Sequence, residues 1–145
     1  TQLHYHLVFS THLREMSITK ELQQRLWEYL GGMIRERGGI AIQVGGMLDH
    51  IHMLITIHQR IAIADLLRDI KAGSSGWVHD TFASAADFRW QTGYGAFTVS
   101  HSAIDDVRDY IVNQETHHRT MTFQEEFRKL LKLNDIEFDE RYLWP

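Results

Sequence analysis

The sequence contains no cysteine among its 145 residues, which excludes disulfide bonds and metal sites built on thiolates. A metal ion in this protein must therefore be held by histidine, carboxylate or amide oxygen. No apolar run approaches the roughly 20 residues that cross a bilayer. The first residues show neither the basic region nor the small-residue cleavage site of a signal peptide. We therefore expect a soluble, cytoplasmic protein.

Positive charge is also scarce, since the sequence has 15 lysines and arginines but 19 acidic residues, and the net charge at pH 7 is −4. Non-specific affinity for nucleic acids comes largely from neutralising phosphates, so this composition argues against an indiscriminate polyanion binder. It leaves room for a local basic groove. Histidine, in contrast, is abundant with 10 residues, and such abundance produces His-x-His pairs by chance. A histidine pair therefore needs support from other residues.

Length and composition predict one domain, residues 1–145, because a 43% hydrophobic chain of this size forms a single core. Alternating apolar residues and helical apolar spacing divide the chain into strands and helices. The strands are expected at 2–10, 40–48, 50–58 and 96–100, and the helices at 18–37, 61–80, 102–118 and 123–133. Residues 84–95 should form a loop with aromatic anchors, and residues from 134 onward a polar tail with late aromatics.

The predicted order is strand, helix, strand, strand, helix, strand, which is that of a ferredoxin-like α+β fold. Such a βαββαβ unit has an antiparallel four-stranded sheet with two helices on one face. Here a further helix and a C-terminal helical tail follow. The other face of the sheet must be solvated, or covered by the added helix or a second subunit.

A histidine pair lies in the third predicted strand, in the stretch "LDHIHMLITIH" at 48–58. The aliphatic residues at 51, 53, 55 and 57 should face the two helices, which sends His50 and His52 to the opposite face. The two imidazoles would lie roughly 7 Å apart along the strand and could converge on one ion. From this pair alone, a strand face that carries histidines by chance is the favoured explanation.

A second pair, Tyr110 and Gln114, lies one turn apart on one face of the helix predicted at 102–118. In isolation, a tyrosine is an ordinary core residue and a glutamine an ordinary surface residue. Together with the histidines, the pair describes a more specific site. Two neutral imidazoles and an amide oxygen would leave a divalent ion with open positions, suited to polarising a phosphate, and a nearby tyrosine could attack that phosphate.

Three motifs in this order resemble the single-tyrosine HUH transposases of small bacterial insertion sequences, of the insertion sequence 200/605 type, with their relatives the REP-associated tyrosine transposases. They are His50-Ile51-His52, the stretch "WQTGYGAFTVS" at 90–100, and the Y-x-x-x-Q of Tyr110 and Gln114. The similarity covers nearly the whole chain, from "HLVFSTHLRE" to "TFQEEFRKLLKLNDIEFDERYLW". The H-x-H motif alone is weak, whereas the combination is specific.

The resemblance implies a homodimer that cleaves and rejoins single-stranded, hairpin-containing DNA ends without a nucleotide cofactor. It implies that His50, His52 and Gln114 hold a divalent metal, Mg²⁺ or Mn²⁺, and that Tyr110 is the nucleophile that forms a 5′-phosphotyrosine intermediate. The protein would be associated with the nucleoid when bound to DNA. Two alternatives are a domesticated relative that nicks chromosomal palindromic repeats and a non-catalytic nucleic-acid-binding domain.

The sequence gives weaker support for a functional role of other residues near these motifs. His4 and His6 lie on the polar side of the first strand and could join the site. Asp49 could orient an imidazole as a hydrogen-bond acceptor. His117 and His118 follow the Tyr110 face, but histidines at a helix end interact favourably with the helix dipole without a catalytic role, so we place them outside the site.

The residues predicted to contact DNA are basic and scattered along the chain: Arg14, Arg68, Lys71, Arg89 and Arg119. No base that could activate the tyrosine is identifiable from the sequence. Some members of the resembling family have a glycine directly before the tyrosine helix, which lets that helix move between subunits. Residues 96–109 contain none here, which leaves open whether Tyr110 serves its own subunit or a partner.

Overall fold

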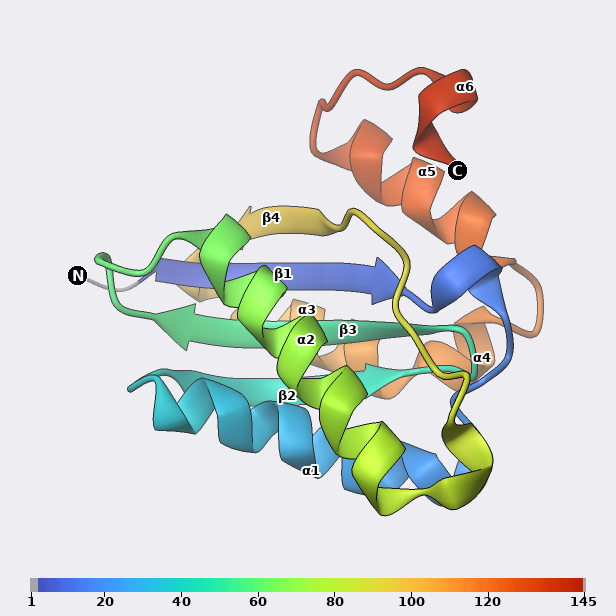
Figure 1. Ribbon diagram of the computed structural model, residues 1–145. Coiled ribbons are helices and arrows are strands. Elements are labelled where there is room, and N and C mark those ends of the chain that lie inside the picture. The colour runs from blue at the N-terminus through green and yellow to red at the C-terminus, as the bar shows by residue number, and fades with distance from the viewer. Residues whose placement is uncertain (1–2, 145) are drawn as a thin grey trace.

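The computed structural model describes residues 3–144, with the side chain of Tyr142 excepted. A four-stranded sheet carries helices on both of its faces (Figure 1). The strands are β1 (Leu3–Ser10), β2 (Ile40–Gly46), β3 (His50–Ile57) and β4 (Gly95–Val99). The α-helices are α1 (Lys20–Glu36), α2 (Ile63–Thr81), α3 (Ile104–Val112), α4 (Gln114–His117), α5 (Phe123–Leu133) and α6 (Glu140–Leu143), and short 3₁₀ turns lie at His12–Arg14, Ala83–Ala85 and His101–Ala103.

The sheet has the strand order β2-β3-β1-β4, and each neighbouring pair is antiparallel. The predicted ferredoxin-like α+β fold, with an added tyrosine-bearing helix and a C-terminal helical tail, is therefore confirmed. In the central pair, Ser10 lies opposite His50 and Val8 opposite His52. The β2–β3 hairpin has an irregularity between Ala41 and Gln43. Strand β3 thus lies between two partners and has no open edge, and nearly all of its side chains are buried.

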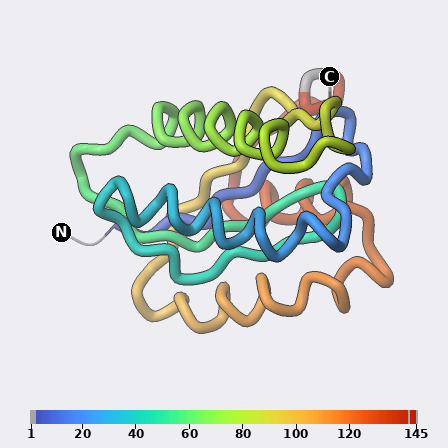
Figure 2. The backbone as a smooth tube through the Cα atoms, turned by 60° about the horizontal axis from the view of Figure 1, so that its bottom comes forward, coloured from blue at the N-terminus to red at the C-terminus, as the bar shows by residue number. Residues whose placement is uncertain are grey.

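The two faces of the sheet are covered by different helices. On one face, α1 and α2 pack over the aliphatic side of β3, and Ile51, Met53 and Ile55 are fully buried there, as the alternation predicts. On the other face, α3 packs against β2 and β3 (Figure 2). Helix α5 also lies there, because its Phe123 and Phe127 cluster with Val8 of β1 and with Phe97 of β4. The histidine face of β3 is consequently enclosed.

The helix predicted from 102 to 118 is instead broken at Asn113. The backbone of Asn113 has φ −93° and ψ 23°, and its side-chain amide donates to the carbonyl oxygen of Asp109 at 2.8 Å. An asparagine side chain that bonds nearby backbone competes with the helical ladder, which accounts for the break. In contrast, α5 begins and ends where the sequence predicts, and the hydroxyl of its N-cap Thr122 accepts from the Glu125 amide.

Gly45 allows α3 to lie close to the sheet. A Cβ at this position would lie 2.8 Å from Ile111 Cγ2 and 3.0 Å from the Ile111 carbonyl oxygen. We expect Gly45→Ala to destabilise the fold by about 1–3 kcal/mol, because α3 and the Tyr110 it carries must shift outward. Urea unfolding would measure this loss.

The matched control is Gly76→Ala in α2, where a Cβ meets nothing within 4 Å. This change should raise helix stability by up to about 1 kcal/mol. Equal effects of the two substitutions would show that α3 does not depend on contact with Gly45.

Candidate active site

His50 and His52 project from the middle of the sheet into the space under α3, α4 and α5, and both side chains are fully buried. Each ring is held by a partner at its Nδ1 atom. His50 Nδ1 lies 2.7 Å from Asp49 Oδ1, and His52 Nδ1 lies 2.8 Å from Nε2 of His6. The Nε2 atoms of both imidazoles therefore point into the same enclosed space.

The tyrosine and glutamine pair reaches this space across the helix break. Gln114 is 2% exposed, and its Oε1 lies 3.0 Å from His50 Nε2. The ring of Tyr110 lies edge-on to His52, with 5.8 Å between the ring centres. The ring of His117 stacks on that of Tyr110, with 4.5 Å between the ring centres. All four residues singled out in the sequence thus lie at one place.

A carboxylate from α5, that of Glu126, lies at the centre of the group. Its Oε1 is 3.0 Å from His52 Nε2, 3.1 Å from His118 Nε2 and 3.3 Å from His50 Nε2. Its Oε2 accepts hydrogen bonds from the Gln114 amide at 3.0 Å and from the Tyr110 hydroxyl. One carboxylate oxygen therefore faces the histidines, and the other faces Tyr110 and Gln114.

The charges in the site follow from burial and from these hydrogen bonds. Burial opposes ionisation of Glu126, but hydrogen bonds from the surrounding histidines outweigh it and hold the pKa of the carboxyl far below its usual range. Burial likewise disfavours a charged His50, yet its bonds to Asp49 and Glu126 raise its pKa to about 9. For His52, burial dominates and lowers the pKa. An ion pair between His50 and Glu126 therefore persists at neutral pH.

The donor set fits a divalent metal ion. The ligand atoms of His50, His52 and Glu126 all lie within 4.8 Å of one another, and all three residues are buried. Histidine ligands typically have their second ring nitrogen fixed by a carboxylate, carbonyl or water, and Asp49 fulfils this for His50. Two imidazoles, a carboxylate and a nearby amide oxygen are donors that several divalent ions accept. This buried group could therefore bind a metal ion.

Burial and the charge of Glu126 also act on Tyr110, and both raise the pKa of its phenol well above its ordinary value. Its hydroxyl is therefore protonated at neutral pH, with Glu126 Oε2 as the acceptor.

The family model described as "Transposase IS200 like" matches residues 1–114, which include both histidines, the tyrosine and the glutamine. The chain belongs to the IS200-like transposase family. Membership implies a DNA-cleaving enzyme that acts in transposition. Glu126 and His118 lie beyond the matched segment, on the C-terminal side of it.

Three known proteins are similar to this chain, one in sequence and two in fold. The transposase is 25% identical over 118 residues to the ISDra2 transposase TnpA of Deinococcus radiodurans, covering 78% of this chain and 84% of that protein. A crystal structure described as a transposase from D. radiodurans superposes with a TM-score of 0.63 at 24% identity, covering 79% of this chain and 92% of the other. A REP-associated tyrosine transposase bound to a REP hairpin superposes with a TM-score of 0.61 at 16% identity, covering 94% and 86%. The last two likenesses concern the fold.

Glu126 and His118 are the residues that sequence reasoning missed in this transposase. The sequence predicts His118 to lie outside the site as a helix-end residue, but the turn after α4 brings its Nε2 to Glu126. A signal for Glu126 was present, because it lies between Phe123 and Phe127 on the apolar stripe of α5. An acid in a buried helical position requires a partner, and so it marks a buried polar site.

The five basic residues predicted to contact DNA lie at three separate places. Arg68, Lys71 and Arg89 line one pocket of about 520 Å³ between α2 and residues 89–94. Arg14 lines a second pocket, beside α5, and Arg119 a third, beside Asp49 and His118. Burial lowers the pKa of Lys71 to about 8. The structure therefore brings together three of the five residues.

Among residues 3–144, the structure contains no helix long and apolar enough to cross a membrane.

Because the pKa of His50 is raised, we expect the free energy of unfolding of the metal-free protein to depend on pH. Between its ordinary pKa of 6.5 and about 9, the folded state holds a proton on His50 that the unfolded state releases. The stabilisation is therefore complete below pH 6.5 and is lost as the pH rises through about 9, with a slope of up to about 1.4 kcal/mol per pH unit. Urea unfolding in EDTA between pH 6.5 and 9 would measure it.

The control for this experiment is His50→Gln, which should remove that slope. Comparison with the variant cancels the contribution of Lys71, whose lowered pKa falls in the same range. His6, whose pKa burial lowers to about 3, and His52 affect only the range below pH 6.5. Parallel stability profiles of the two proteins would contradict the His50–Glu126 ion pair.

Proposed function

We propose that this transposase cleaves and rejoins single-stranded, hairpin-containing DNA ends through a covalent 5′-phosphotyrosine on Tyr110, with the help of a divalent metal. One observation carries the proposal: the Tyr110 hydroxyl and the imidazoles of His50 and His52 meet on a single buried carboxylate, that of Glu126. A nucleophile beside a metal-binding group is an arrangement suited to metal-assisted cleavage of a phosphodiester.

We assign the metal to His50, His52 and Glu126, with Gln114 as a further ligand through Oε1. The bound ion, Mg²⁺ or Mn²⁺, would act as a Lewis acid that polarises the scissile phosphate. The sequence suggested only neutral ligands for the ion. The addition of Glu126 lowers the net charge of the loaded site by one and provides the oxygen ligand that Mg²⁺ prefers.

In the cleavage step that we propose, the Tyr110 oxygen forms a bond to phosphorus while the bond between phosphorus and the 3′-oxygen breaks. The phenolic proton leaves along the hydrogen bond to Glu126 Oε2 and passes to solvent, and the leaving 3′-oxygen takes up a proton from solvent to become a 3′-hydroxyl. The new phosphotyrosine conserves the phosphodiester energy. Attack by a 3′-hydroxyl on this linkage reverses the step and rejoins DNA without a nucleotide cofactor.

Hairpin DNA is the substrate that the comparisons favour, because the REP-associated tyrosine transposase of similar fold is bound to a REP hairpin. Arg68, Lys71 and Arg89 line one pocket and are our candidates for phosphate contacts at the hairpin. Arg14 and Arg119 are candidates for DNA contacts nearer the active site. An active enzyme is favoured over a non-catalytic binding domain, because the nucleophile and the ligand set lie together. A host role on chromosomal palindromic repeats involves the same chemistry.

We also propose that two chains associate while each Tyr110 serves its own site. Strand β2 is an edge strand whose Ile40 is 60% exposed, and such an edge favours pairing with a second copy. Tyr110 already contacts Glu126 of its own chain.

Metal removal provides the direct test of the proposal. With Mn²⁺ or Mg²⁺, the wild-type protein should form a covalent adduct with labelled hairpin DNA that survives denaturing electrophoresis, and EDTA should prevent it. His50→Ala should reduce adduct formation by at least a hundredfold, because the site loses both a ligand and a buried ion pair. Calorimetric titration with Mn²⁺ should show the matching loss of metal affinity.

The control is His12→Ala, which removes a half-buried histidine from the turn after β1 and should retain adduct formation. Adduct formation by wild-type protein in EDTA, or by His50→Ala at the wild-type rate, would exclude the metal site.

A further inference from the structure

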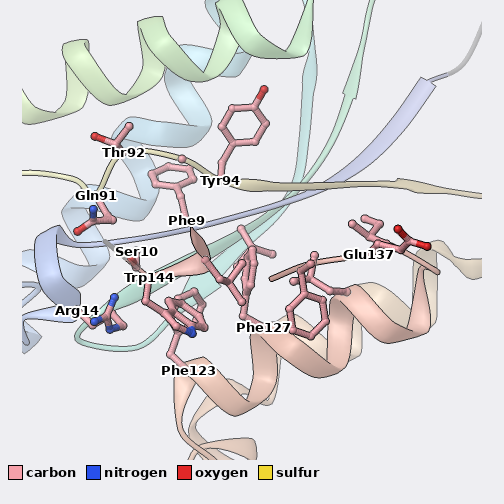
Figure 3. Close-up of a pocket in the computed structure, with 16 residues that line it drawn as sticks. Phe9, Ser10, Arg14, Gln91, Thr92, Tyr94, Phe123, Phe127, Glu137 and Trp144 are labelled. Carbon is pink, nitrogen blue, oxygen red and sulfur yellow. The ribbon is translucent and has the colours of Figure 1, made fainter. Parts of the chain in front are cut away.

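A pocket of about 500 Å³ lies beside the active site, between β1, residues 91–94 and the C-terminal helices (Figure 3). Tyr94 and Ile136 in its lining are 43% and 41% exposed, so the pocket reaches the surface. Aromatic side chains dominate its wall, and they come from segments far apart in the sequence: Phe9, Tyr94, Phe123, Phe127, Phe138 and Trp144. None of the groups proposed to bind the metal, and not Tyr110, lines this pocket.

The pocket and the active site share a wall. Ser10 and Val8, which line the pocket, lie directly across the β1–β3 ladder from His50 and His52. Phe123 lines the pocket as well, and its ring stacks on that of His50 with 4.4 Å between the ring centres. A ligand in this pocket would therefore lie next to a phosphate held at the active site.

The charged side chains that line the pocket lie at its ends. Arg14 lies at one end with its guanidinium 5.2 Å from the ring centre of Trp144. Its Nη1 atom is buried and has no hydrogen-bond partner among the described residues. Glu137 lies at the opposite end of the pocket (Figure 3). A buried donor without a partner is costly, so the Arg14 guanidinium points to a ligand that offers an acceptor.

We propose that this pocket binds one unpaired nucleobase of the DNA strand next to the scissile phosphate. The inference rests on the proposed function and adds a subsite to it. Single-stranded nucleic acids are bound by stacking of their bases on aromatic side chains and arginine planes. A base has the flat apolar faces that the rings require and edge acceptors for Arg14 Nη1. The carboxylate of Glu137 disfavours a phosphate at its end and can accept from an exocyclic amino group.

The test compares two hairpin oligonucleotides with short single-stranded flanks, one with normal bases and one with abasic residues in the flanks. The abasic strand keeps its phosphates, so the difference in affinity reports the bases alone. In EDTA, wild-type protein should bind the normal flanks roughly tenfold to hundredfold more tightly, as expected for stacking of a base. Fluorescence anisotropy with full-length protein would measure both affinities.

Two variants of the pocket should reduce this preference to less than about threefold. Arg14→Gln removes the unpaired donor, and Phe138→Ala, in the segment before α6, removes part of the aromatic wall. The control is Arg128→Gln, which removes an equal charge that also lies over the Trp144 ring, at 5.8 Å, but outside the pocket. It should retain the full preference for bases.

Equal affinity of the wild-type protein for the two DNAs would overturn the subsite. We expect equal affinity if the pocket instead binds a phosphate, an apolar peptide or a second copy of the chain. A base preference that survives both pocket variants would overturn it as well. Covalent adduct formation with Mn²⁺ is measured separately on the same DNA. Its failure would exclude the proposed function, whereas the difference in binding alone decides the subsite.

Discussion

Replacing Tyr110 by phenylalanine should abolish covalent attachment of DNA, with a loss on the order of 10⁴-fold or more in adduct formation, as for other enzymes that lose their nucleophile. The ring and its stacking on His117 remain in the variant. Only the hydroxyl is lost, with its hydrogen bond to the ionised Glu126, so the free energy of unfolding should fall by about 1.5–3 kcal/mol. Denaturing electrophoresis of labelled hairpin DNA with Mn²⁺ measures the adduct, and urea unfolding measures the stability.

Tyr29→Phe is the matched control, because Tyr29 lies in α1 and stacks on Trp77 of α2 away from the site. It should form the adduct at the wild-type rate. A mixture of the inactive Tyr110→Phe and His50→Ala proteins should remain inactive if each tyrosine serves its own chain. Adduct formation by Tyr110→Phe would show that another residue is the nucleophile, and activity of the mixture would show that the tyrosine acts in a partner's site.

Replacing Glu126 by alanine should have the largest effect on the folded protein. The carboxylate is fully buried and is hydrogen-bonded or ion-paired to three histidines, Gln114 and Tyr110. Without it, these donors lose their common acceptor and the charge of His50 loses a partner. Removal of one member of a buried ion pair costs about 3–5 kcal/mol, and we expect a loss of this size in metal-free urea unfolding.

Glu126→Gln separates the charge of this residue from its shape. The amide fills the same space, so part of the stability should return, but Mn²⁺ affinity should remain more than about a hundredfold below that of wild type. Glu115→Ala, which removes an exposed acid from α4, should change neither property. Wild-type Mn²⁺ affinity in Glu126→Gln would exclude the carboxylate as a ligand and leave Gln114 as the third one.

Much of the fold was predictable because it depends on local patterns. The alternation in β3 separated the aliphatic face from the histidine face, and the apolar spacing of α5 gave its bounds. The break at Asn113 was not predictable from periodicity, because it depends on a side-chain hydrogen bond to the backbone. Tyr110 and Gln114 nevertheless lie on the same side of the chain, since both bond to Glu126 Oε2. The helical spacing therefore predicted their proximity, although the helix between them is broken.

The sequence by itself determined the histidine pair, the tyrosine and the glutamine, because strand and helix periods fix which side chains share a face. Only the tertiary structure decided that Glu126 and His118 join them. Glu126 is distant in sequence from His50 and His52, and its place depends on how α5 packs over β1 and β4 through Phe123 and Phe127. Contacts of this kind depend on the packing of whole elements, and no local pattern encodes them.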